Sequence, residues 1–168
     1  MKKTIEPKSD QLNADDLIGG AKTIRIRDVK ATDSETQPVS IFFDGDNNKP
    51  YKPSKGMRRV LVALWGADAK TYIGRSLTLY RDDKVKFGGI EVGGIRISHA
   101  SHITEPTRVI ETVSRGKRRP VTIQVLKTKK TLTDIDGAKE AIEKGTHTFE
   151  QISDAYDLTE EQIKILKS

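Results

Sequence analysis

Cysteine is absent from this 168-residue chain, and aromatic residues make up only 5% of it. Without cysteine there is no disulfide, no thiolate metal site and no cysteine nucleophile, which fits a reducing cytosol. The longest apolar run, residues 60–65, is far shorter than the ~20 residues that a bilayer span needs. The first six residues contain lysines but no apolar stretch after them, so no secretory signal is expected. We therefore expect a cytoplasmic protein that makes no contact with a membrane.

Acidic residues are scarce in the first part of the chain and abundant in the last. Residues 1–130 carry 26 Lys and Arg against 15 Asp and Glu, a net charge of +11. Residues 131–168 carry 4 against 9, a net charge of −5. A basic body is typical of proteins that meet a polyanion, and an acidic end then meets a different partner.

The hydrophobic pattern of the body predicts a small β domain. Apolar and polar residues alternate in several short segments, and a helical pattern with Ser54 as its cap and Gly66 as its end interrupts them. The expected strands are residues 23–27, 39–43, 75–81, 95–98, 108–113 and 121–125. This pattern favours a mainly β fold with α elements, a small antiparallel OB-like barrel with an inserted helix. A β-sandwich is the alternative, because spacing alone does not give the strand order.

The acidic end is predicted to be helical. Thr148 with Gln151 and Thr159 with Gln162 both match the capping-box pattern, which marks the start of a helix. We expect three domains or segments: a polar N-terminal segment with a short helix (1–20), a basic OB-like barrel (21–130) and an acidic three-helix module (131–168). The last two helices resemble a helix-turn-helix, but Glu160 would begin the reading helix, where phosphates would repel it. Docking of a protein partner, or of a second copy of this chain, is therefore the preferred interpretation.

A basic cluster occupies the expected hairpin tip between the last two strands. Its cations are Arg115, Lys117, Arg118 and Arg119. Four cations on a loop can neutralise successive phosphates and release their counterions. The alternative is a solvated loop whose charges only increase solubility.

A second candidate site combines aromatic rings with positive charge. Its members are Tyr80, Arg81, Lys84, Lys86 and Phe87. Proteins that bind single strands pair a basic groove with rings on which bases stack. Tyr80 alternates away from the apolar strand residues and is the stronger stacking candidate, followed by Phe87. The alternative is that both rings belong to the core.

The sequence gives little support for a metal site, a calcium site or a catalytic site. His99 and His102 have no third histidine nearby, and two residues three apart face opposite sides of a strand, so no metal site is predicted. Asp44, Asp46 and Asn48 imitate the first ligands of a calcium loop, but the later glycine and glutamate are lysines. No nucleophile elbow and no Ser/His/Asp set is evident, so we expect neither an enzyme nor a cofactor.

Four segments resemble a group of known proteins. Residues 13–18, 57–62, 74–81 and 93–99 are similar to small, mostly uncharacterised proteins of bacteriophages, prophages and related mobile elements. The layout of a basic small barrel with an acidic end also resembles, in outline, phage proteins that bind single-stranded DNA. The resemblance implies a bacterial host cell and a role in DNA replication or recombination, but it supplies no functional residues.

These observations lead to one hypothesis and two alternatives. We expect a non-enzymatic protein that binds single-stranded DNA or RNA with weak sequence preference and strong salt dependence. The first alternative is a phage-encoded interaction factor, an inhibitor or adaptor of a host complex, whose basic face meets an acidic protein. The second is a DNA-binding regulator that uses the helical end.

Overall fold

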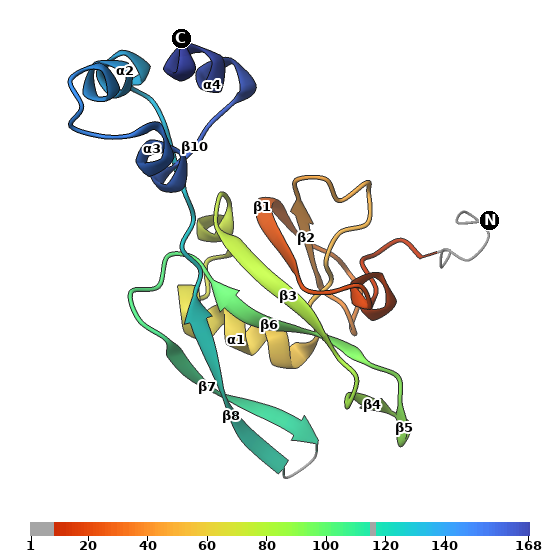
Figure 1. Ribbon diagram of the computed structural model, residues 1–168. Helices are drawn as coiled ribbons and strands as arrows, with labels where there is room; N and C mark the ends of the chain where they lie inside the picture. The colour runs from red at the N-terminus through yellow and green to blue at the C-terminus, as the bar shows by residue number, and fades with distance from the viewer. Residues whose placement is uncertain (1–8, 115–116) are drawn as a thin grey trace. The chain divides into compact units, whose positions relative to one another are not determined.

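The computed structural model describes residues 9–114 and 117–168, which form two compact units (Figure 1). The division falls between Leu126 and Lys127. No helix in the described part of the chain has the length and apolar character needed to cross a membrane.

The first unit is built on a mixed six-stranded sheet. The strand order is β2-β1-β3-β6-β8-β7, and every neighbouring pair is antiparallel except β6 with β8. The strands are β1 (Lys22–Ala31), β2 (Val39–Phe43), β3 (Ser76–Asp82), β6 (Gly94–Ala100), β7 (Thr107–Ser114) and β8 (Lys117–Val125). The mainly β fold with helices is thus confirmed. The sheet is not closed into a barrel, so the antiparallel OB-like barrel is not confirmed.

Alternation of apolar residues explains one buried face of this sheet. Ile24 lies opposite Leu77 in the β1–β3 register, and Leu79 lies opposite Ile97 in the β3–β6 register. All four side chains are buried. Removal of these branched side chains from water drives the pairing and fixes the register, because a shift by one residue would expose them.

Helix α1 (Lys55–Trp65) supplies the second layer of this core. Ser54 caps it by accepting a hydrogen bond from the Met57 amide, and Gly66 ends it with a φ of 87°, which favours glycine. Its buried residues are Met57, Val60, Leu61 and Trp65. Two 3-10 turns, η2 (Ala14–Leu17) and η3 (Ala69–Tyr72), complete the core with Leu17 and Tyr72.

A small hairpin connects β3 to β6. It consists of β4 (Lys86–Phe87) and β5 (Ile90–Glu91), with Gly88 and Gly89 at its turn. Both glycines have positive φ, which other residues rarely adopt, so the pair of glycines shapes this turn. The hairpin extends beyond the ends of β3 and β6 (Figure 1).

The second unit contains three short helices. They are α2 (Ile135–Glu143), α3 (Phe149–Ala155) and α4 (Glu160–Lys167), and β9 (Lys130–Thr131) pairs in parallel with β10 (Tyr156–Asp157). Both predicted capping boxes are present, at Thr148 with Gln151 and at Thr159 with Gln162. Leu132, Ile152 and Leu166 form the buried centre of this unit.

Candidate nucleic-acid interface

An ion network ties the β7–β8 hairpin to β3 and β6. The Arg119 guanidinium lies 3.1 Å from Asp82 Oδ2 and 3.2 Å from Glu111 Oε2. The Arg96 guanidinium bonds to Glu111, and its Nε lies 3.7 Å from Asp82 Oδ2. Two arginines and two carboxylates thus alternate across four strands, and their charges cancel.

This network lies where backbone pairing between β6 and β8 is missing. The two strands pair only at His99 with Gln124 and at Ala100 with Val125. Pro120 lies on β8, opposite Ile110 of β7. Proline has no amide hydrogen, so it is tolerated where β8 has no backbone partner on its other side. Side-chain ion pairs therefore join the β7–β8 hairpin to β3 and β6 where the ladder has ended.

Burial sets the electrostatics of the network. Burial lowers the pKa of Arg96, and the Asp82 carboxylate opposes that effect. Burial of Asp82 disfavours its charged form, but the Lys84 amide and the two arginines outweigh this and lower the pKa of Asp82. Glu111 is only 2% exposed, so it needs both arginines to compensate its charge.

Three of the predicted phosphate-binding cations have carboxylate partners. Arg119 belongs to the network described above. Arg81 donates to Asp83 Oδ1 at 2.5 Å and also bonds to Asp15, and the hydrogen bond to Asp83 raises the pKa of Arg81. Lys86 lies 3.6 Å from Glu91 across the β4–β5 hairpin. The sequence analysis did not anticipate these carboxylate partners, which are distant in sequence or lie across a turn.

Other predicted residues are exposed. Lys84 and Arg118 are exposed, and no described residue forms an ion pair with either. Phe87 is 81% exposed, whereas Tyr80, which we expected to be the stronger stacking candidate, is half-buried. Arg115 lies outside the described residues, and of Lys117 only the backbone is described, as the first residue of β8.

The expected basic loop is largely strand. The sequence placed residues 114–120 in a hairpin tip, but β8 starts at Lys117 and Arg119 pairs with Glu111 of β7. The physical reason is the cross-strand ion pair, which extends the ladder beyond the apolar residues that define the pattern.

The outward face of the sheet carries further candidates that the sequence analysis missed. By register, Arg25, His99 and Arg108 lie with Tyr80 and Arg118 on the side opposite the buried strand residues. The three arginines are exposed and the two rings are half-buried. Alternation alone could have identified Arg25 between Ile24 and Ile26, and Arg108 before Val109. We call these five residues the outer face.

A groove lies beside the β4–β5 hairpin. It has a volume of about 500 Å³, and Lys86 and Phe87 line it together with Gln11, Tyr51 and Ile95. A smaller cavity of about 270 Å³ adjoins it at the start of α1 and shares Ser54, Val85, Gly94 and Ile95 as lining residues. The groove therefore joins a predicted ring and a predicted cation to a helix N-terminus.

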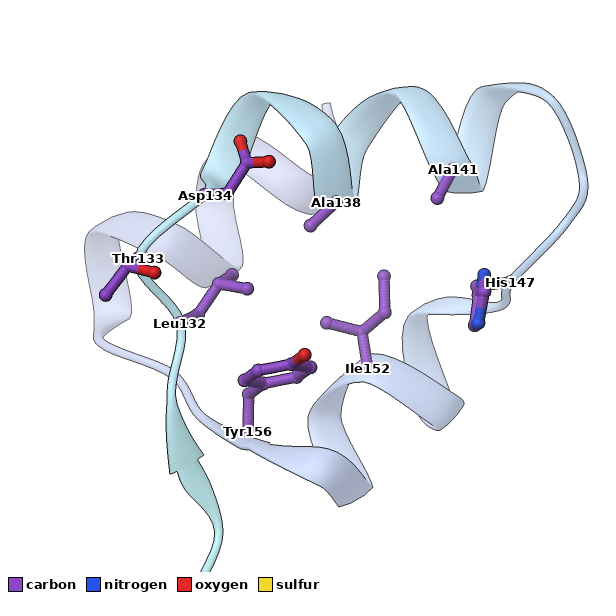
Figure 2. A pocket seen from close by; sticks show the side chains of 8 residues that line it. All are labelled: Leu132, Thr133, Asp134, Ala138, Ala141, His147, Ile152 and Tyr156. Carbon is purple, nitrogen blue, oxygen red and sulfur yellow. The ribbon is translucent and has the colours of Figure 1, made fainter.

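The helical unit has a pocket of its own (Figure 2). It has a volume of about 240 Å³ and lies between α2 and α3. Ile152 and Tyr156 point into it from the α3 side, and Ala138 and Ala141 face them from α2 (Figure 2). Asp134 and His147 lie at its edge, so the pocket is apolar with a polar rim.

The weak metal and calcium patterns have local structural explanations. His99 and His102 bond through Nδ1 to the hydroxyls of Ser98 at 2.9 Å and Ser101 at 2.8 Å. The Asp46 carboxylate accepts from the amides of Phe43 and Asn48 within its own turn. Within residues 9–114 and 117–168, no group of three or more His, Asp or Glu side chains is arranged to hold a metal ion.

The chain matches no family model, and no similarity to a curated protein or to a solved structure was detected.

Proposed function

We propose that the first unit binds single-stranded nucleic acid, with single-stranded DNA as its ligand. The observation that supports this proposal best is the 81% exposure of Phe87 at the β4–β5 hairpin, close in sequence to the unpaired cation Lys84. Aromatic residues are scarce in this chain, and an exposed ring beside positive charge is the combination on which unpaired bases stack.

The outer face extends this site over the sheet. Arg25, Arg108 and Arg118 are exposed there, and no carboxylate forms an ion pair with them in the described part of the chain. These cations can follow a phosphate backbone, while Tyr80 and His99 offer half-buried ring edges between them. The arrangement favours contact with the backbone and stacking over readout of base sequence. The biological role that we propose is in the replication or recombination of phage or mobile-element DNA.

A titration of labelled oligonucleotides tests this function. Fluorescence anisotropy is measured with a single-stranded and a double-stranded 20-mer at 50 mM and 200 mM salt. We expect preference for the single strand and a log–log salt slope of about −3, since four unpaired cations release about 0.7 counterion each. Absence of binding at 50 mM salt would remove the proposal.

A separate observation favours a second activity, in the acidic unit. We propose that the pocket between α2 and α3 docks a basic amphipathic helix of a protein partner. The pocket is apolar, and residues 131–168 carry a net charge of −5, so the matching segment presents an apolar stripe flanked by lysines or arginines.

A defined peptide pair tests the docking proposal. A Leu/Lys peptide with leucines at helical spacing should bind the full chain, and a peptide of the same composition with scattered leucines should not. Ala141→Leu fills the pocket and should abolish binding, whereas Ala63→Leu, on the exposed side of α1, should not. Equal binding of the two peptides would refute the proposal.

A further inference from the structure

Two buried polar atoms beside the groove of the first unit have no partner. The hydroxyl of Tyr51 and the Oε1 atom of Gln11 are buried, and neither has a hydrogen-bond partner among the described residues. Both residues line the 500 Å³ groove. Buried polar atoms are almost always hydrogen-bonded, so two such atoms at one groove indicate a polar ligand there.

Tyr51 is held firmly in this position. It is only 1% exposed, and its backbone forms a bridge with Ile41 through hydrogen bonds of 2.8 and 2.9 Å. Burial raises the pKa of Tyr51, so its hydroxyl remains protonated at neutral pH and can donate a hydrogen bond. The Gln11 amide offers an acceptor and donors beside it.

The adjoining cavity has the properties of an anion site. It lies at the N-terminus of the 11-residue helix α1, where backbone amides and the helix dipole favour negative charge. Lys55 and Arg96 also line it. The Arg96 charge is already balanced by Glu111 and Asp82, but its Nε atom, 3.7 Å from Asp82 Oδ2, is buried without a hydrogen-bond partner among the described residues. A Cβ atom at Gly56 would lie 3.6 Å from Glu111 Oε1 and 3.9 Å from Arg96 Nη1, so the Arg96–Glu111 ion pair, carboxylate included, is close to the first helical turn.

We propose that these two cavities form a seat for one nucleotide of the bound strand, which rests on the proposed single-strand-binding function. The base enters the larger groove, where the Tyr51 hydroxyl and the Gln11 amide bond to its edge and Phe87 packs at the hairpin side. The phosphate lies at the start of α1, between Lys55 and Arg96. Shared lining by Ser54, Val85, Gly94 and Ile95 makes the two cavities continuous.

The Tyr51→Phe variant tests the seat, because it removes only the unpartnered hydroxyl. Affinity is measured by anisotropy for an oligothymidylate and for an abasic sugar–phosphate strand of equal length. We expect Tyr51→Phe to weaken binding of the oligothymidylate about fivefold, as for one lost hydrogen bond, with no change for the abasic strand. The melting temperature of the free variant should not decrease, because the hydroxyl has no partner to lose.

Tyr72→Phe is the matched control. The Tyr72 hydroxyl donates to the Gly66 carbonyl at 2.5 Å, away from the groove. This variant should be less stable than the wild type and should bind the oligothymidylate equally well. Equal affinity of Tyr51→Phe and wild type for the oligothymidylate would overturn the seat while leaving strand binding intact.

Free thymidine monophosphate separates the seat from strand binding altogether. In ¹⁵N-labelled full-length protein, millimolar nucleotide should shift the amide signals of Gly56 and Gly94, which line the smaller cavity. If the wild type binds no oligonucleotide but these shifts occur, the single-strand function fails and a site for free nucleotides stands. If neither amide shifts, the seat is refuted.

Discussion

Arg119 Nη2 lies 3.1 Å from Asp82 Oδ2, and this pair joins two strands that share no backbone ladder. Arg119 follows Arg118 directly, but the two arginines have different surroundings. The Arg119 side chain also contacts the buried Glu111, whereas Arg118 is exposed on the outer face. Adjacent cations of one basic cluster thus have separate roles, one in holding the sheet and one in the proposed contact with phosphate.

The two arginines should separate stability from binding. Arg119→Ala should destabilise the first unit by about 1–2 kcal/mol, because Glu111 and Asp82 lose a partner while Arg96 remains. Arg118→Ala should change the free energy of unfolding by less than about 0.5 kcal/mol and reduce the salt slope of DNA binding by about 0.7. Urea unfolding and anisotropy titrations measure the two effects. A normal stability of Arg119→Ala would contradict the structural role.

Local patterns in the sequence predicted much of the fold. The capping boxes at Thr148 and Thr159 and the helix start at Ser54 depend on residues three apart, which the sequence displays directly. The alternation within residues 75–81 also predicted the strand β3, whose apolar residues Leu77 and Leu79 are buried in the structure. Short-range geometry determines these features, so they can be predicted without knowing how the rest of the chain folds.

Contacts between residues that are far apart in the sequence could not be predicted from local patterns. The parallel pairing of β6 with β8 joins His99 to Gln124, and nothing in either strand specifies that partner or its direction. The carboxylates that neutralise Arg81 and Arg119 include Asp15 and Asp82, 66 and 37 residues away. Composition reports the net charge of the body, but only the folded sheet determines which cations remain unpaired.

Phe87 should matter for binding and not for folding. Phe87→Ala should lower the affinity for single-stranded DNA by about 1–3 kcal/mol, the value of one stacked base, and leave the urea midpoint unchanged. Ile90→Ala removes a neighbouring side chain that is also exposed but has no ring, and it should have a smaller effect on affinity. If both variants lose affinity equally, the hairpin contributes apolar area rather than stacking.

The acidic unit should depend on its caps. Thr148→Ala and Thr159→Ala each remove a side-chain acceptor for the amide of a glutamine three residues later, at 3.2 Å in both cases. Each should destabilise the unit of residues 127–168 by about 1 kcal/mol, and serine at either position should restore most of it. Hydrogen exchange of the full chain measures this locally. Unchanged protection in α3 and α4 would contradict the importance of the caps.

Lowering the pH should weaken the ion network at pH values that are still above the folded-state pKa of Asp82. That pKa lies below its ordinary value of 3.8, because the Lys84 amide and the two arginines outweigh the effect of burial. The stabilisation is therefore complete above the unfolded-state pKa and disappears as the pH falls through the folded-state pKa. We expect the urea midpoint of the wild type to decrease below about pH 5, and Asp82→Asn to flatten part of that decrease. Asp44→Asn, at an exposed turn residue, is the control and should leave the pH profile unchanged. A profile for Asp82→Asn as steep as that of the wild type would show that another carboxylate, with Glu111 as the first to test, carries the dependence.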